Sequence, residues 1–127
     1  MDITLGPWTA EHAADKPLAE AMGDEAWKTV EKSSDWTPQK AVNGKAGKKG
    51  YTVSGRLTSV VKEGSKTQIF SAFTILVDGA LSNVPPIQGT GFAQAPNTAE
   101  DALRAITESR VNKILGTLKT GRVVKAA

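Results

Sequence analysis

Residues 50–79, GYTVSGRLTSVVKEGSKTQIFSAFTILVDG, constrain the fold more than any other part of the chain. Two runs rich in β-branched and aromatic residues flank Glu63-Gly64-Ser65-Lys66, which is the pattern of two strands joined by a hairpin turn. So short a connection allows antiparallel neighbours but not the crossover that parallel strands need. We therefore expect a β-hairpin at the centre of the chain and no all-parallel sheet.

The two strands of this hairpin differ in their pattern of apolar residues. In the first, Val53, Leu57 and Val61 share one face, so we expect a half-buried strand. The second has apolar residues on both faces, namely Ile69, Phe73, Ile75 and Val77 on one and Phe70, Ala72 and Leu76 on the other. Two apolar faces are typical of a central, covered strand. Replacement of Phe73 by Asp is accordingly expected to abolish folding.

Helical patterns lie on both sides of the hairpin. The first apolar stripe, with a period of four residues, consists of Leu18, Met22, Ala26 and Val30. Pro17 fits the first turn of this helix, and residues 33–35 end it after about four turns. The second helix is predicted from about Ala99 to Leu118, with Thr98 as its N-cap and Asp101 at the third position. Each helix is long enough to cover part of one sheet face.

Shorter strands complete the pattern. Residues 1–5 alternate as a strand that Gly6-Pro7 ends, Pro38 interrupts a strand signal at Trp36-Thr37, residues 87–93 form a strand, and residues 122–124 form an optional last one. The glycines at positions 89 and 91 predict a bulge or a close backbone approach. The order is β-α-β-β-β-α. We predict one α+β domain over residues 1–127, with two helices packed on one face of an antiparallel sheet of three to five strands.

Composition narrows the functional classes. The chain of 127 residues has no Cys and a single histidine, His12. It also lacks the run of about 18 to 20 apolar residues that a membrane span needs. Adjacent carboxylates such as Glu100 and Asp101 point in different directions on a helix, and no Gly-x-Ser-x-Gly elbow is present. We therefore expect no membrane span, no catalytic residue, no metal and no cofactor.

Three features are candidates for binding another molecule. The loop NGKAGKKG carries Lys45, Lys48 and Lys49. It lacks the spacing of a phosphate-binding Walker loop. It is either a solvated loop or a cationic loop that binds nucleic acid, a lipid headgroup or an acidic partner. Trp27 lies off the Leu18 stripe, so it is either a packing residue or an interface anchor. Pro85 and Pro86 make the link at 80–86 irregular. We predict that a partner binds at these residues or on the open sheet face.

The order of motifs resembles the small α+β domains of bacterial envelope lipoproteins, such as LpoB-type activators of penicillin-binding proteins, the amino-terminal domain of TolB and the CsgG core. The resemblance is carried by Ser54-Gly55-Arg56-Leu57 after the first helix, Asp78-Gly79 after the second hairpin strand, and Gly89-Thr90-Gly91 before the closing helix. It implies a non-enzymatic binding or assembly module, located in the periplasm or at the outer membrane, with an envelope enzyme or assembly as its protein partner. The lipoprotein Cys is missing.

A second class fits the same order of elements. An α-β-β-β-α order with lysines in a loop also resembles double-stranded RNA-binding domains, which contact phosphates and the minor groove. The formal net charge of +3, from 16 cationic and 13 anionic residues, does not decide between the two classes. Under this alternative, Met1 is native and the protein is cytoplasmic; under the envelope interpretation, Met1 replaces an export signal.

Overall fold

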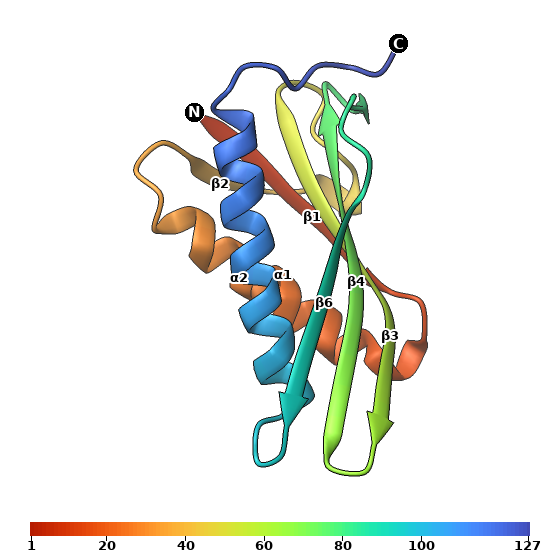
Figure 1. The fold of residues 1–127 in the computed structure, drawn as a ribbon. Helices are drawn as coiled ribbons and strands as arrows, with labels where there is room; N and C mark the ends of the chain where they lie inside the picture. The colour runs from red at the N-terminus through yellow and green to blue at the C-terminus, as the bar shows by residue number, and fades with distance from the viewer.

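The structure, a computed structural model, describes residues 1–127 and has the predicted α+β class. Its strands are β1 (Asp2–Ala10), β2 (Thr37–Lys40), β3 (Tyr51–Glu63), β4 (Lys66–Val77), β5 (Ala80–Leu81) and β6 (Ile87–Gln94). Its helices are α1 (Lys16–Glu31) and α2 (Ala99–Leu118), with short 3-10 turns at Ala13–Asp15 and Val42–Gly44. The chain ends lie at one end of the molecule and the β3–β4 turn at the other (Figure 1).

All six strands form one sheet in the order β2-β1-β3-β4, with β5 and β6 both pairing β4. Strand β1 runs parallel to both β2 and β3, whereas β3–β4 and β4–β6 are antiparallel. The sheet is therefore mixed and has six strands, in place of the antiparallel three to five expected. The physical reason is α1, which carries the chain from the end of β1 back across the sheet and allows β2 and β3 to run parallel to it.

The central hairpin is confirmed, with Glu63 paired to Lys66 at its turn. Phe73 on β4 is 0% exposed, as expected for a central strand. Val61 was expected on the same buried face as Val53 and Leu57. This prediction is wrong, because the Val61 side chain is 47% exposed. The register of β3 shifts between Leu57 and Ser59, and the extra residue turns the following side chains to the other face.

Both helices cover the same face of the sheet, as predicted (Figure 1). Helix α2 approaches β6 so closely that a Cβ on Gly91 would lie 2.9 Å from the carbonyl oxygen of Ala102. The expected close approach at the strand glycines is therefore present. Between the layers lies one core of 19 buried residues that includes Phe73, Leu103 and Ile114.

Three boundaries differ from those expected. Strand β1 continues past Gly6-Pro7 to Ala10, because a register shift between Leu5 and Trp8 absorbs the irregularity. Residues 37–40 form β2 despite Pro38, since β2 is an edge strand whose outer side needs no donor. Residues 122–124 are not a strand; only an isolated bridge joins Lys125 to Ser82.

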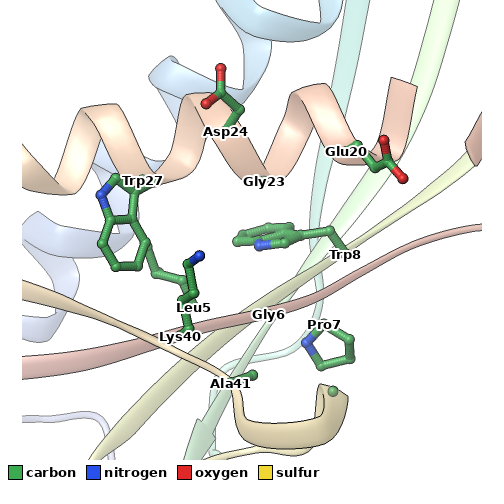
Figure 2. A pocket seen from close by; sticks show the side chains of 11 residues that line it. Leu5, Gly6, Pro7, Trp8, Glu20, Gly23, Asp24, Trp27, Lys40 and Ala41 are labelled. Carbon is green, nitrogen blue, oxygen red and sulfur yellow. The ribbon is translucent and has the colours of Figure 1, made fainter. Parts of the chain in front are cut away.

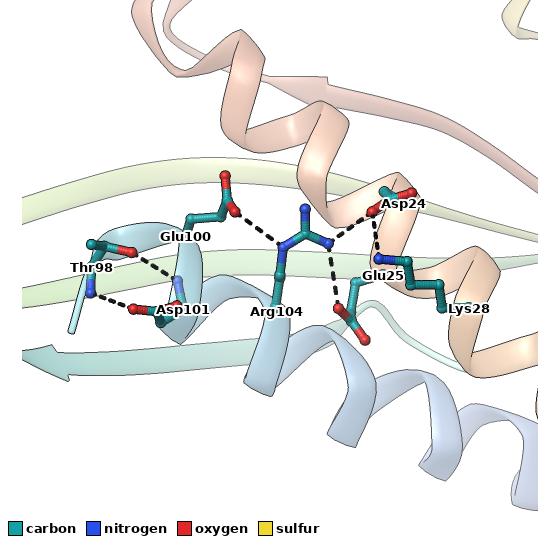
Figure 3. A network of polar contacts seen from close by, with 7 residues as sticks. All are labelled: Asp24, Glu25, Lys28, Thr98, Glu100, Asp101 and Arg104. Atoms are coloured by element: carbon teal, nitrogen blue, oxygen red, sulfur yellow. Dashed lines mark hydrogen bonds and ion pairs between the residues drawn. The ribbon is translucent and has the colours of Figure 1, made fainter.

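The start of α2 agrees with the sequence. Thr98 accepts a hydrogen bond at Oγ1 from the backbone N–H of Asp101 over 3.2 Å, and the Asp101 carboxylate accepts one from the backbone N–H of Thr98 over 2.8 Å. The two residues thus form a reciprocal capping box (Figure 3). The hydrogen bond from the Thr98 backbone N–H, followed by hydrogen bonding of the Thr98 side chain to the carboxylate, lowers the pKa of Asp101, because both favour its charged form.

Candidate functional site

A pocket of about 540 Å³ opens between α1, the middle of β1 and the end of β2 (Figure 2). Trp8 forms its inner wall, with the indole lying between Gly23 of α1 and Gly55 of β3. A Cβ would lie 2.4 Å from an indole atom at Gly23 and 2.8 Å from one at Gly55. The two glycines leave the room that the indole occupies, so Trp8 is held between the helix and the sheet.

Trp27 forms the facing wall of this pocket, which we call the indole pocket (Trp8, Trp27, Lys40 and their neighbours). Figure 2 shows the Lys40 side chain rising between the two indoles. Trp27 is half-buried and packs partly against the core. One part of its side chain thus packs and another lines an open cavity, and its role as an interface anchor stays a prediction.

The carboxylate of Asp24, on the rim of the indole pocket, is already engaged. Its Oδ2 lies 2.9 Å from Nη1 of Arg104 and 3.2 Å from Nζ of Lys28. Arg104 also contacts Glu25 and Glu100, so one guanidinium joins α2 to α1 (Figure 3). The hydrogen bond from Arg104, followed by that from Lys28, lowers the pKa of Asp24. Asp24 is thus an ion-paired carboxylate rather than a free acid or base.

A second hollow, which we call the lysine hollow, lies beside the indole pocket and shares Lys40 with it. Its lining residues are Thr4, Gln39, Lys40, Val42, Asn43, Lys45, Ala46, Gly47 and Lys48. The lining contains three cations and no acid. None of the six ion pairs in the chain involves Lys40, Lys45 or Lys48. The hollow therefore presents three uncompensated positive charges.

Two hydrogen-bonded contacts fix the loop that carries these lysines. The backbone N–H of Gly47 donates to Oγ1 of Thr52 over 3.0 Å, and that of Gly50 donates to the Asp78 carboxylate over 2.7 Å. Thr52 is fully buried beneath the loop. The residues 45–49 are thus attached to the open face of β3 and to the turn after β4.

The remaining predicted site residues are not part of the two hollows. Lys49 is exposed on the same loop, and Pro85 and Pro86 are exposed in the connection between β5 and β6. The structure therefore brings Trp27 close to Lys45 and Lys48 through Lys40. It leaves the two prolines on another part of the chain.

Among the lining residues that the sequence does not predict, Trp8 and Lys40 matter most, because Trp8 forms the inner wall and Lys40 joins the two hollows. Trp8 follows Gly6-Pro7, where the sequence predicts the end of a strand, and Lys40 lies outside the glycine-rich loop that marks the other lysines. Neither position carries a local signal, because β1 and β2 are brought together by the parallel pairing of Leu5 with Lys40.

The structure contains no cluster of metal-binding side chains. His12 is exposed before the first 3-10 turn, and no three His, Cys, Asp or Glu side chains gather as a metal site would require. Neither helix combines the length and hydrophobicity needed to cross a lipid bilayer.

Several solved structures have a similar fold. The PelC dodecamer from Paraburkholderia phytofirmans aligns with a TM-score of 0.60 and 16% identity, covering 92% of this chain and 85% of that chain. The hypothetical protein CT253 from Chlamydia trachomatis gives 0.61 and 6%, covering 94% and 96%. Lipoprotein GNA1162 from Neisseria meningitidis gives 0.52 and 11%, covering 91% and 98%. No protein-family model and no curated protein matches the chain.

At these identities the similarity concerns the fold alone. A putative lipoprotein from Caulobacter crescentus, with a TM-score of 0.51, belongs to the same group of structures. The expected resemblance to envelope lipoproteins is confirmed at this level, whereas a relation to LpoB-type activators, TolB or CsgG stays a prediction. The chain shares its fold with PelC and with bacterial envelope lipoproteins.

Proposed function

We propose that this chain is a non-enzymatic binding module of the bacterial cell envelope that acts through contacts with another protein. One observation carries the proposal: the indole pocket and the lysine hollow meet at Lys40. Tryptophans that line pockets are frequent anchors of protein interfaces. Uncompensated lysines favour an acidic partner. The fitting partner is a protein segment that places an apolar side chain between the indoles and carboxylates near the lysines.

The lining of the indole pocket supports binding rather than catalysis. It contains no serine, threonine, histidine or cysteine that would act as a nucleophile or a proton shuttle. Of its two carboxylates, that of Asp24 is held by Arg104 and Lys28, whereas that of Glu20 forms no ion pair. The occurrence of the fold in envelope lipoproteins supports a periplasmic or outer-membrane location, and an envelope enzyme or assembly as the partner.

Photocrosslinking in the cells that produce the protein tests this proposal. A photoreactive amino acid replaces Lys45 or Lys48 in the lysine hollow, and Lys62 at the far end of β3 serves as the exposed control. We expect both hollow positions to give an adduct with the same envelope protein, through an acidic segment of it. The control position is expected to give none. Adducts that form equally at all three positions, or only with cytoplasmic proteins, would contradict the proposal.

Charge reversal then tests the chemistry of the contact. Lys40→Glu places a carboxylate between the two indoles, so the adduct is expected to disappear. Lys113→Glu is the matched control, because Lys113 is exposed on α2 and makes no ion pair. The adduct is also expected to weaken as salt rises, since exposed charges are screened. Equal loss with both variants would indicate a nonspecific effect of net charge.

The three free lysines also favour nucleic acid as a second candidate partner. Phosphates bind to exposed lysines, and such binding weakens steeply with salt. Electrophoretic mobility of duplex RNA measured with the wild-type chain and with Lys45→Glu and Lys48→Glu distinguishes the candidates. A salt-dependent shift that both substitutions remove, without any envelope adduct, would favour this second candidate.

A further inference from the structure

The strand edges of the sheet differ in how they are guarded against other chains. An unpaired edge offers a row of N–H and C=O groups to any extended segment, and proteins usually blunt it with proline, charge or a covering segment. Five stretches of edge exist here, on β2, β5, β6, the end of β3 that extends beyond β1 and the end of β1 that extends beyond β2, where Pro7 interrupts the row of donors. The other four have such a device, whereas β6 has no proline and no charge within the strand, and only its Gln88 carbonyl is covered, by Arg110 of α2.

The guarded edges illustrate the contrast. On β2, Thr37 and Ala41 donate toward β1, so the alternating residues Pro38 and Lys40 face outward. Pro38 has no donor and Lys40 is charged. The overhang of β3 ends in the charged residues Lys62 and Glu63. The edge of β5 is covered by the C-terminal segment, because Ala126 donates to Leu81.

Strand β6, IQGTGFAQ, contains no charged residue and no proline, and it pairs only with β4. Nε of Arg110 donates to the carbonyl oxygen of Gln88 over 2.8 Å, which places the Gln88 backbone on the outer side. Backbone groups alternate between the two sides of a strand. Thr90 and Phe92 therefore turn their N–H and C=O groups outward, where no group of this chain pairs with them.

Two further observations concern the same edge. Phe92 is 60% exposed, whereas Phe73 on the neighbouring strand β4 is fully buried. A shallow hollow of about 230 Å³ lies beside it, lined by Thr90, Gly91, Phe92, Ala102, Ala105 and Ile106. The free backbone groups thus lie next to an apolar strip that extends onto α2.

We propose that a second copy of this chain pairs with this edge, β6 against β6 in antiparallel orientation about a two-fold axis at Thr90. In that register each Thr90 faces its counterpart, and Gln88 of one copy faces Phe92 of the other. The outward donors of each strand then meet the outward acceptors of the other. The Gln88 carbonyl, which already accepts from Arg110, receives a second hydrogen bond on its other lone pair. The uncharged strand brings no like charges together, although each copy carries a net charge of +3. This interface shares no residue with the indole pocket or the lysine hollow of the proposed function.

Sedimentation velocity across the micromolar range tests the proposal. We expect the wild type to form a dimer and Thr90→Pro to remain a monomer, because proline removes an outward donor that β4 does not use. Lys62→Pro is the matched control: it removes the outward donor at the overhang of β3 and is expected to leave the dimer intact. A wild type that stays monomeric, or a dimer that survives Thr90→Pro, would overturn the proposal.

A second pair of variants keeps the test decisive if proline disturbs folding. Thr90→Lys places two like charges face to face across the axis and is expected to abolish the dimer. Thr9→Lys adds the same charge to an exposed position on β1, and is expected to have no effect on the dimer. The chain has no Cys, so Thr90→Cys also reports the register: a short bismaleimide is expected to link the two copies. Dimers that Thr90→Lys leaves unchanged would place the interface elsewhere.

Discussion

The indole of Trp8 lies in the space that Gly23 leaves open on α1, where a Cβ would be 2.4 Å from the ring. Helix propensity alone says that Gly23→Ala should stabilise the protein by about 1 kcal/mol. The contact with a large, rigid ring reverses this sign, because overpacking usually costs about 1 to 3 kcal/mol. We expect Gly23→Ala to lower the free energy of unfolding, as measured by urea denaturation.

Gly116 on α2 provides the matched control for this prediction. It is also a glycine inside a helix, but no atom lies within 4 Å of where its Cβ would be. Gly116→Ala is therefore expected to stabilise the protein by about 1 kcal/mol through propensity. If both substitutions stabilise it equally, the indole of Trp8 is not held against the helix.

The fold follows from the sequence where local pattern and tertiary contacts agree. Helix α2 has the predicted bounds, because the Thr98 cap and the apolar stripe mark the same segment. The residues of strand β2 do not by themselves predict it, since Pro38 argues against a strand and only pairing with β1 makes it one. The exposure of Val61 was missed for a similar reason, because the bulge after Leu57 depends on the neighbouring strands.

The candidate site was predictable only in part. Lys45 and Lys48 carry a local signal, a cationic glycine-rich loop, and Trp27 is marked by its position off the helical stripe. That these residues lie near one another depends on Lys40, which reaches the pocket through the parallel β1–β2 pair. Parallel pairing between strands separated by a helix leaves no spacing in the sequence, so the juxtaposition appears only in the structure.

The two indoles of the pocket are expected to differ in their contribution to stability. Trp8 is enclosed by Gly23 and Gly55, so Trp8→Ala leaves a cavity between helix and sheet. A loss of about 3 kcal/mol is expected, as for other large aromatic residues in packed positions. Trp27 has one side toward the open pocket, so Trp27→Ala is expected to cost less than half as much. Urea denaturation of both variants checks the order, and a larger loss for Trp27→Ala would contradict it.

Acid titration is expected to reveal the contact between Arg104 and Asp24. The pKa of Asp24 in the folded chain lies below its ordinary value of 3.8, chiefly because Arg104 donates a hydrogen bond to it. The ion pair therefore stabilises the fold above this pH and is lost as the pH falls through the lowered pKa. Arg104→Gln is expected to lower the melting temperature at pH 7, by an amount that shrinks toward pH 3 and in high salt.

Lys113→Gln is the control for that titration, because Lys113 is exposed on the same helix and forms no ion pair. It is expected to leave the melting temperature nearly unchanged at both pH values. A difference between Arg104→Gln and wild type that stays constant down to pH 3 would show that the guanidinium acts through packing rather than through charge.

Thr107 on α2 is completely buried, and its hydroxyl has no hydrogen-bond partner. A buried polar group without a partner loses its hydration and gains nothing in return, which costs about 1 to 3 kcal/mol. Valine has nearly the same shape without the hydroxyl, so Thr107→Val is expected to raise the free energy of unfolding by about 1 kcal/mol. Thr29 on α1 is the matched control: it is also buried, but its hydroxyl donates to the carbonyl oxygen of Glu25 over 2.8 Å. Thr29→Val removes that bond and is expected to give no gain, so equal stabilisation by both substitutions would contradict the argument.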